Sequence, residues 1–562
     1  MPATVIVNAR LVNEGRVTEG DLRIENGRIA RIAAEIRPQG DDTVIDAAGR
    51  WLLPGMIDDQ VHFREPGMPH KGDMATESAA AVAGGLTTFM DMPNTSPPTL
   101  DAAALEDKYQ RAKGRAWGNY GFYLGASNDN LEAIRTLDPK TAPGIKVFMG
   151  ASTGNMLVDN PDTLDAIFRE APTPIITHCE DTPTIDANLA AFQAKYGDAL
   201  SAEHHPDIRS REACIKSTRL AMSLARRHGT RLHVLHISTA DELALFTPGP
   251  LVQPDGKCKQ ITAETCIHFL RFDRADYAAL GNLIKCNPAI KDAGDREALI
   301  KALVDDVVDV LATDHAPHTL EEKEKPYVQA PSGLPLVQYA LVAALELVHE
   351  GRMDVARVVQ KFAHAPAQLF DVKERGYLRE GYFADLVLID DEPFTVKRED
   401  VLSKVGWSPF EGRTFRSRIG ATRVTGPRPH GLEWPASGRH AQRPAPGVRA
   451  LKLIAAALFA AVCAGWVPLV VAQDVVPAAP VPQEERVVFP ASVPQGALVF
   501  GKVPPGSQVR YRERLLRATG YGTVAFGVGR DETGPLKVDV TLPSGRVEPV
   551  SSAVTPRDWP GE

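Results

Sequence analysis

The clearest fold signal in this chain is the stretch Met56-Ile57-Asp58-Asp59-Gln60-Val61-His62-Phe63-Arg64-Glu65-Pro66-Gly67. The apolar residues that lead into it, 52–57, predict a buried strand that runs directly into acidic and imidazole side chains before a Pro-Gly turn. Ligand-type side chains at the end of a buried strand are what a barrel active site requires. A single histidine in such a position is more often a hydrogen-bonded structural residue, so the interpretation depends on whether the pattern recurs downstream.

The middle of the chain alternates short apolar strands with helical stretches, which is typical of a parallel α/β fold. We expect eight strands, near residues 56–62, 86–92, 118–125, 144–149, 173–178, 231–237, 260–265 and 307–313. Eight strand–helix units predict a (β/α)8 barrel with its chemistry at the carboxyl ends of the strands. The alternative is an open doubly wound sheet, but no glycine-rich phosphate turn follows the first strand.

The two ends of this region differ from its middle in their pattern of apolar and polar residues. Residues 4–50 alternate apolar and polar side chains with repeated turn signals, and a similar pattern returns at 381–389 and 419–424. We therefore expect a small discontinuous β domain, residues 1–53 and 375–426, built from both ends around a barrel at 54–374.

After residue 426 the composition changes again. Residues 427–452 are rich in Pro, Gly, Arg and His, a composition that predicts a linker. Residues 453–472 are uncharged and apolar. An apolar run of about 20 residues is just long enough to span a bilayer. We interpret it as a transmembrane or signal-like helix that would contact a membrane, with a buried core helix as the alternative. A β-rich tail, 473–562, follows.

Composition limits the class of protein. The chain has 562 residues, 44% of them hydrophobic and 24% charged, as in an ordinary globular enzyme. Its net charge of −8 argues against a nucleic-acid partner, because nucleic-acid binders usually carry a basic face. Six cysteines without a CxxC pair suggest reduced thiols, and the first residues lead straight into a strand pattern rather than a signal peptide. We expect a cytoplasmic enzyme.

Ligand-type residues recur at the ends of five predicted strands: His62, Lys146, His178, His236 and Asp314. Each has an ordinary explanation by itself, such as a lysine that extends to solvent or an aspartate that caps a helix. Together, at the ends of strands 1, 4, 5, 6 and 8, they would converge on one pocket. Imidazoles and carboxylates suit zinc or a similar divalent ion. A lysine deep in a barrel is unfavourable as an ammonium, and reaction with CO2 would convert it into a carboxylate-like ligand.

Three motifs carry a family resemblance. The segments 62–67 (His-Phe-Arg-Glu-Pro-Gly), 92–95 (Met-Pro-Asn-Thr) and 312–318 (Ala-Thr-Asp-His-Ala-Pro-His) resemble those of dihydroorotases, in the cyclic amidohydrolase superfamily. The similarity covers about residues 2–426. It implies a (β/α)8 barrel with a small β domain, and the reversible cyclisation of N-carbamoyl-L-aspartate to L-dihydroorotate in pyrimidine synthesis. Hydantoinases and allantoinases share the metal ligands but lack this pairing of Arg-Glu-Pro-Gly with Met-Pro-Asn-Thr.

The resemblance also implies roles for single residues. Carbamylated Lys146 would bridge two metal ions, one bound by His62 and Asp314 and the other by His178 and His236. Asp314 would also act as general base and general acid around a metal-activated hydroxide. The substrate contacts would come from Arg64, Asn94, Asn287 and His318.

One residue departs from the family pattern. The resemblance leads us to expect Asp-x-His-x-His at the first strand, whereas here residues 58–62 place Gln60 at the first histidine. An amide oxygen is a weaker, neutral ligand. The more exposed metal is therefore expected to bind weakly or to be absent, which leaves one zinc ion, or two of unequal affinity.

The tail and the function each leave alternatives open. Residues 489–560 weakly resemble the β-rich region ahead of the catalytic domain in lysostaphin-type cell-wall peptidases, without that family's zinc ligands. The tail is either an exported module tethered by residues 453–472 or the product of two joined reading frames. Besides a dihydroorotase, the sequence allows a hydantoinase or allantoinase, or a non-catalytic barrel that scaffolds a partner such as aspartate transcarbamoylase. Homo-oligomer formation stays open.

Overall fold

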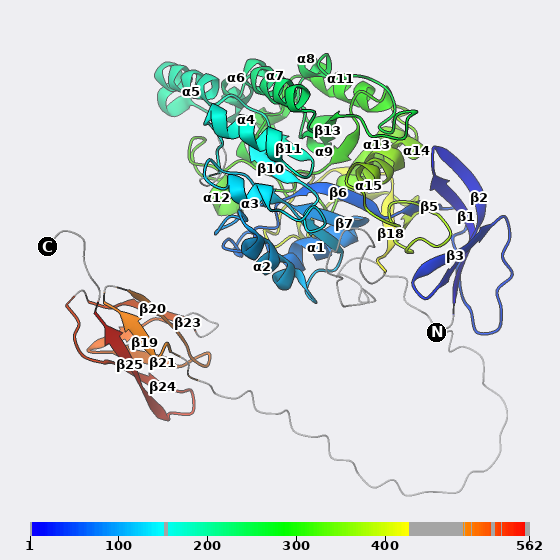
Figure 1. The fold of residues 1–562 in the computed structure, drawn as a ribbon. Helices are drawn as coiled ribbons and strands as arrows, with labels where there is room; N and C mark the ends of the chain where they lie inside the picture. The colour runs from blue at the N-terminus through cyan, green and yellow to red at the C-terminus, as the bar shows by residue number, and fades with distance from the viewer. Residues whose placement is uncertain are drawn as a thin grey trace, which may run out of the picture. The chain divides into compact units, whose positions relative to one another are not determined.

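The computed structural model describes residues 3–150, 156–425 and 487–556, the last range with gaps at 488, 496, 519–522 and 530. The chain divides into two compact units, Met1–Ala457 and Leu458–Glu562 (Figure 1). The predicted linker at 427–452 and the predicted apolar helix at 453–472 lie outside the described residues. Among the residues that are described, no helix is both long and apolar enough to cross a bilayer.

The first unit is built on a closed barrel of parallel strands. Its strands are β6 (Met56–Val61), β7 (Leu86–Asp91), β8 (Asn119–Phe122), β9 (Leu124–Gly125), β10 (Ile145–Phe148), β11 (Ile175–His178), β12 (Leu232–Val234), β13 (Ile261–Cys266) and β14 (Val310–Ala312). They pair in the orders β6-β7-β8 and β9-β10-β11-β12-β13-β14. β8 and β9 are one strand interrupted at Tyr123, whose N–H still donates to Asp91 O on β7 at 3.2 Å.

The ring closes between the first and last strands. His62 N donates to His315 O at 2.7 Å, and Val61 forms a parallel bridge with His315. The predicted (β/α)8 barrel is therefore confirmed, and the open doubly wound sheet is excluded. Each of the eight strands lies where the apolar runs predict it.

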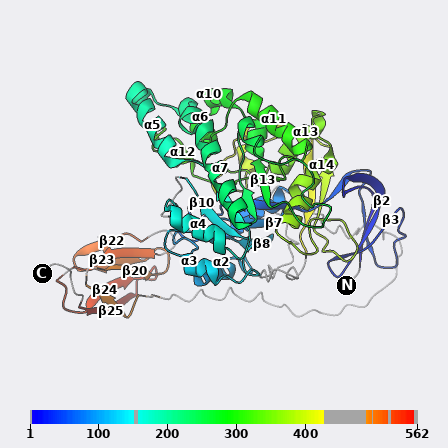
Figure 2. The same ribbon diagram turned by 45° about the horizontal axis from the view of Figure 1, so that its top comes forward.

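Helices cover the outer face of the barrel, as Figure 2 shows for α7, α11 and α13. The α-helices are α1 (Met74–Ala83), α2 (Ala102–Ala112), α3 (Leu131–Arg135), α4 (Pro161–Glu170), α5 (Thr182–Tyr196), α6 (His205–Ile208), α7 (Arg211–His228), α8 (Ala240–Leu243), α9 (Ile267–Arg271), α10 (Tyr277–Leu280), α11 (Ala293–Val304), α12 (Leu320–Lys323), α13 (Ala340–His349), α14 (Val355–Val359) and α15 (Ala365–Leu369). The 3₁₀ turns are η1 (Gly197–Ala199), η2 (Ala202–His204), η3 (Arg274–Asp276), η4 (Gly281–Ile284) and η6 (Arg398–Asp400), and η5 (Gln360–His364) is a π-helical turn.

The local sequence explains where a helix such as α7 begins and ends. The Ser210 side chain accepts from Ala213 N at its start, and Gly229 ends it in the left-handed region at φ 70°. Both are common terminators, because a side-chain oxygen satisfies a free N–H and glycine adopts positive φ without strain. The helix buries a stripe of small and apolar residues against the barrel: Ala213, Cys214, Ala221, Met222, Leu224 and Ala225.

A second sheet joins both ends of the first unit. Its order is β18-β15-β5-β1-β2-β3, with β4 beside β1. The strands are β1 (Thr4–Asn13), β2 (Arg16–Glu25), β3 (Arg28–Ala33), β4 (Thr43–Asp46), β5 (Trp51–Pro54), β15 (Leu386–Asp390) and β18 (Arg418–Arg423), and β16 (Phe394–Thr395) pairs separately with β17 (Thr414–Phe415). β5 and β15 run antiparallel with Leu53 opposite Val387, so the predicted discontinuous β domain is present (Figure 1).

The second unit contains a β-rich fold of its own, as predicted for the tail. Its strands are β19 (Ser492–Pro494), β20 (Leu498–Lys502), β21 (Gln508–Tyr511), β22 (Arg514–Leu516), β23 (Thr523–Gly527), β24 (Leu536–Thr541) and β25 (Val547–Thr555). They form one sheet in the order β19-β25-β24-β21-β22 and a second of β20 and β23. A separate apolar core includes Val499, Val509, Val538 and Val540.

Candidate active site

All nine predicted site residues line one cavity of about 290 Å³ at the carboxyl ends of the barrel strands. They are His62, Arg64, Asn94, Lys146, His178, His236, Asn287, Asp314 and His318. Gln60 lies in the same wall, together with Phe148, Arg209, Ala316, Pro331, Ser332 and Gly333. The convergence expected from the strand order is therefore present.

The backbone at the strand ends places these side chains. Lys146 lies within β10 and His178 ends β11, whereas His236 and Asp314 each follow the last residue of a strand by two positions. His236, Asp314 and Arg64 have φ of 42°, 51° and 67°. Non-glycine residues rarely adopt this left-handed conformation, and they do so most often where function requires a particular side-chain direction.

The two imidazoles from β11 and β12 face each other. His178 Nδ1 lies 2.9 Å from His236 Nε2, and the rings meet edge to face with centroids 4.8 Å apart. Burial lowers the pKa of both histidines, so both rings are neutral and offer lone pairs at neutral pH. Neutral imidazole is the form that binds a metal ion.

Lys146 is buried beside this pair with little to balance its charge. Its Nζ lies 4.8 Å from the centroid of the Phe148 ring, and the residue is 1% exposed. Burial lowers the pKa of Lys146 to about 8, although Asp314 and Glu264 partly oppose the shift. A buried lysine beside two neutral imidazoles is unfavourable as an ammonium ion. As a carbamate, it would complete a metal centre with the two imidazoles.

Two other residues of the cavity wall approach Asp314 Oδ1 at hydrogen-bond distance. Gln60 Nε2 lies 2.9 Å from it and His62 Nε2 lies 3.1 Å from it. An ionised carboxylate only accepts, so the Gln60 amide turns its NH2 group toward Asp314. The Gln60 oxygen instead lies 3.9 Å from Cys266 Sγ, so Gln60 acts as a hydrogen-bond donor to Asp314 in this arrangement.

Burial by itself would raise the pKa of the Asp314 carboxyl. The hydrogen bond from His62 and the nearby His62, His268 and Lys146 charges outweigh burial and lower it. His62 is held from its other side by Asn94, with Nδ1 2.8 Å from Asn94 Oδ1. His62 and Asp314 therefore form a hydrogen-bonded pair in the wall of the cavity that Lys146 also lines.

The other end of the cavity is cationic. Arg64 is 4% exposed, donates from Nε to Pro317 O at 3.1 Å, and has Nη2 2.9 Å from His318 Nε2. Lys71 Nζ lies 3.1 Å from the other ring nitrogen of His318. Burial, followed by the Arg64 and Lys71 charges, lowers the pKa of His318, so this ring is neutral. No carboxylate lies within ion-pair distance of Arg64 among the described residues.

Two residues near the histidines carry no role in the sequence analysis. Glu180 is fully buried, lies 3.1 Å from His178 Nε2, and pairs with Arg209, which lines the cavity. Its position two residues after His178 is a signal that sequence reasoning could have used. Arg209 follows the short helix α6 and offers no such signal, because only the fold brings it to the pocket.

The segment 331–333 also reaches the cavity. Ser332 O lies 3.1 Å from His318 Nε2. Asn287 Oδ1 is buried and has no hydrogen-bond partner among the described residues, so an acceptor is available in the cavity wall.

The sequence profile described as Amidohydrolase family matches residues 51–416. The chain belongs to the amidohydrolase family. This family is generally metal-dependent, in agreement with the imidazole, carboxylate and lysine set in the cavity. The match ends before the second unit, whose resemblance to lysostaphin-type peptidases stays a prediction.

The individual proteins that this chain is similar to include a dihydroorotase, an allantoinase and a hydantoinase. The chain is 33% identical over 420 residues to a dihydroorotase from Methanosarcina mazei, covering 73% of this chain and 91% of that protein. It is 30% identical over 426 residues to an allantoinase from Bacillus velezensis, covering 74% and 92%. Among solved structures it resembles L-hydantoinase (dihydropyrimidinase) from Arthrobacter aurescens, with a TM-score of 0.71, 27% identity, and coverage of 78% of this chain and 98% of that chain.

Proposed function

We propose that the first unit, Met1–Ala457, called the enzyme unit below, is a dihydroorotase, which interconverts N-carbamoyl-L-aspartate and L-dihydroorotate. The observation that carries this proposal is the buried guanidinium of Arg64 in the same cavity as the candidate metal ligands. Relatives named dihydroorotase, from several archaea, support the same activity.

Arg64 has no carboxylate within ion-pair distance in the part of the chain that the structure describes, so it is suited to bind one from a substrate. A buried cation is costly unless it is paired, and Arg64 still has Nη1 without a hydrogen-bond partner among the described residues. Guanidinium binds carboxylate through strong, directional hydrogen bonds. Dihydroorotate carries a carboxylate next to its ring, whereas hydantoin and allantoin carry none.

We assign the remaining polar groups of the cavity to the substrate ring. Asn94, from the loop after β7, would share the carboxylate with Arg64, and His318 would hold Arg64 in place while contacting the ring. Asn287 Oδ1, the buried acceptor without a partner, would accept a ring N–H. A polar atom left unsatisfied in the wall favours a ligand that supplies the missing donor.

We further propose that the cavity holds zinc, as one ion or as two of unequal affinity. His178, His236 and a carbamylated Lys146 would hold the inner ion, and His62 with Asp314 the outer one. Carbamylation needs the neutral amine: Nζ forms a bond to the carbon of CO2 and releases a proton, which the lowered pKa of Lys146 favours. When bound, the metal supplies Lewis-acid activation of water and of the ring carbonyl.

Asp314 is the group placed to carry the proton. Gln60 and His62 hold its Oδ1, and its Oδ2 has no hydrogen-bond partner among the described residues. Because its pKa is lowered, the carboxylate is ionised at neutral pH and can take a proton from the attacking water. It then returns that proton to the leaving ring nitrogen, and ring closure runs these transfers in reverse.

The proposal is tested by assaying the purified protein on L-dihydroorotate, N-carbamoyl-L-aspartate, hydantoin and allantoin at neutral pH with added zinc. We expect hydrolysis of dihydroorotate and closure of N-carbamoyl-L-aspartate, with much slower turnover of the two neutral rings. Preferred turnover of allantoin or hydantoin would replace this function with that of the related enzymes. No turnover of any of the four by metal-loaded protein would favour the non-catalytic scaffold.

A further inference from the structure

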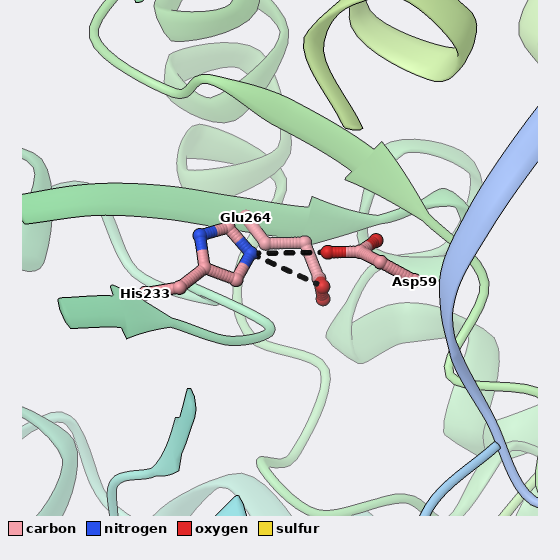
Figure 3. Close-up of side chains that lie close together, drawn as sticks. All are labelled: Asp59, His233 and Glu264. Atoms are coloured by element: carbon pink, nitrogen blue, oxygen red, sulfur yellow. Dashed lines mark ion pairs between the residues drawn. The ribbon is translucent and has the colours of Figure 1, made fainter. Parts of the chain in front are cut away.

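A second group of ligand-type side chains lies inside the barrel and does not line the catalytic cavity. Asp59 on β6, His233 on β12 and Glu264 on β13 point toward one another, as Figure 3 shows. His233 Nε2 lies 3.2 Å from Asp59 Oδ2 and 3.7 Å from Glu264 Oε2. All three side chains are fully buried, and none of them belongs to the cavity wall.

Apart from these ion pairs with one another, the facing atoms of this group have no hydrogen-bond partners among the described residues. Both carboxylate oxygens of Asp59, Nε2 of His233 and Oε2 of Glu264 are buried and unsatisfied. Buried polar atoms in native proteins are nearly always paired, so a group of such atoms without outside partners needs an explanation.

A hydrogen bond on the far side of His233 fixes which nitrogen of its neutral ring is free. Thr262 Oγ1 lies 3.2 Å from Leu232 O, a carbonyl that can only accept, so the hydroxyl donates to it. The same hydroxyl must then accept from His233 Nδ1 at 2.8 Å. The neutral ring therefore carries its lone pair on Nε2, which faces the two carboxylates.

Such an arrangement attracts a cation. His233 Nε2 faces the carboxylates of Asp59 and Glu264, and all three side chains are buried in the barrel interior. With both carboxylates ionised, a single proton on the imidazole would leave one negative charge uncompensated in the barrel interior. A divalent cation would neutralise both carboxylates at once and satisfy the Nε2 lone pair.

We propose that Asp59, His233 and Glu264 form an internal binding site for a first-row divalent metal ion such as zinc or manganese. Their ligand atoms all lie within 4.8 Å of one another. Metal–ligand bonds of about 2.0–2.2 Å place neighbouring ligand atoms about 3–3.5 Å apart, close to the spacings from His233. One imidazole with two carboxylates is a donor set that such ions accept.

Surrounding contacts hold the three ligands in place, as outer contacts do at metal sites generally. Thr262 orients His233, and the second oxygen of Glu264 accepts from His236 N at 3.1 Å and lies 3.3 Å from Cys266 Sγ. Glu264 thus links the internal site to the backbone of His236, a residue of the catalytic cavity. The internal ion would be structural, because full burial leaves no open position for substrate.

The decisive experiment is crystallography of the full chain, prepared with zinc and separately with manganese, with data collected at the absorption edge of each metal. We expect an anomalous peak bonded to Asp59 Oδ2, His233 Nε2 and Glu264 Oε2, in addition to any peak in the catalytic cavity. Anomalous peaks confined to the catalytic cavity, with both metals, would overturn the proposal and make the cluster a buried ion pair.

Metal analysis of variants provides a second readout that does not depend on activity. We expect Asp59→Asn and His233→Gln each to contain one metal ion fewer per chain than the unmodified protein. His364→Gln is the matched control, since it also removes a buried imidazole but lies beside Gly376 and Glu14 without a carboxylate contact. An unchanged metal count in folded Asp59→Asn protein would contradict the proposal. Variants that do not fold leave the anomalous map to decide.

Discussion

Asp314 holds its two carboxylate oxygens in different environments, and this difference is the basis of its proposed role. Replacing it by asparagine keeps the shape and the contacts with Gln60 and His62 but removes the proton acceptor. We predict that Asp314→Asn folds normally and loses about 10²- to 10⁴-fold in kcat, the usual effect of removing a general acid–base group. Steady-state dihydroorotate hydrolysis measures the loss, with Asp305→Asn, an exposed partner of Lys301, as the control. Near-normal turnover by Asp314→Asn would rule out the proton-transfer scheme.

Gln60 turns an amide NH2 toward Asp314, so it contributes no imidazole to the outer metal position. We predict that Gln60→His binds about one more metal ion per chain than the unmodified protein after mild chelation, because imidazole is the stronger ligand. Gln60→Ala removes the amide without adding a ligand and should gain none. Metal analysis of the three proteins side by side tests this. Two equally tight ions in the cavity of the unmodified protein would show that Gln60 does not weaken the outer position.

At the residue scale, the sequence predicts side chains that follow buried strands, such as His178 and Asp314, because strand ends of a barrel meet at one place. It does not predict that the Gln60 amide would face Asp314, since this orientation depends on a contact 254 positions away. The sequence does not predict the cluster of Asp59, His233 and Glu264 for a related reason. They lie within or between apolar strand residues, and only closure of the barrel brings them together.

At the scale of elements, the eight barrel strands are predictable because each is a short apolar run between turn signals. The sequence evidence for pairing β5 with β15 is weaker. It consists of a similar alternation of apolar and polar residues in two distant segments. The structure reinforces this pairing with Asp385, which forms a buried ion pair with Arg375 and accepts from Thr425 N at 2.7 Å and from Asn119 Nδ2 on β8 at 3.1 Å. One carboxylate therefore connects the small β domain to the barrel.

Removal of this carboxylate should destabilise the enzyme unit strongly. Asp385→Ala leaves Arg375, which is 1% exposed, as an unpaired buried charge, and such losses typically cost about 3–5 kcal/mol. We predict a clearly lower denaturant midpoint for unfolding of the enzyme unit. Glu35→Ala, which removes one partner of a solvent-exposed pair with Arg37, should leave the midpoint unchanged. Equal midpoints for Asp385→Ala and the unmodified protein would show that this junction is not important for stability.

At the scale of the whole molecule, the two units have separate apolar cores and the family match ends within the first. Every lining residue of the cavity lies between Gln60 and Gly333, and the last strand of the small β domain ends at Arg423. We predict that a chain truncated after Pro429 has the kcat and KM of the full chain measured in detergent. A truncated protein that is folded but inactive would make the tail a part of the enzyme.

The central claim is that Arg64 selects a substrate by its carboxylate, and dihydrouracil tests it most directly because it is dihydroorotate without that group. The measurement is kcat/KM for L-dihydroorotate and for dihydrouracil, on the unmodified protein and on Arg64→Gln. We predict that the unmodified protein prefers dihydroorotate by at least about 100-fold, since a site that binds a polar group discriminates strongly against its absence. Arg64→Gln should lose most of this preference. Comparable kcat/KM values for the two substrates on the unmodified protein would contradict the assignment of this cavity to dihydroorotate.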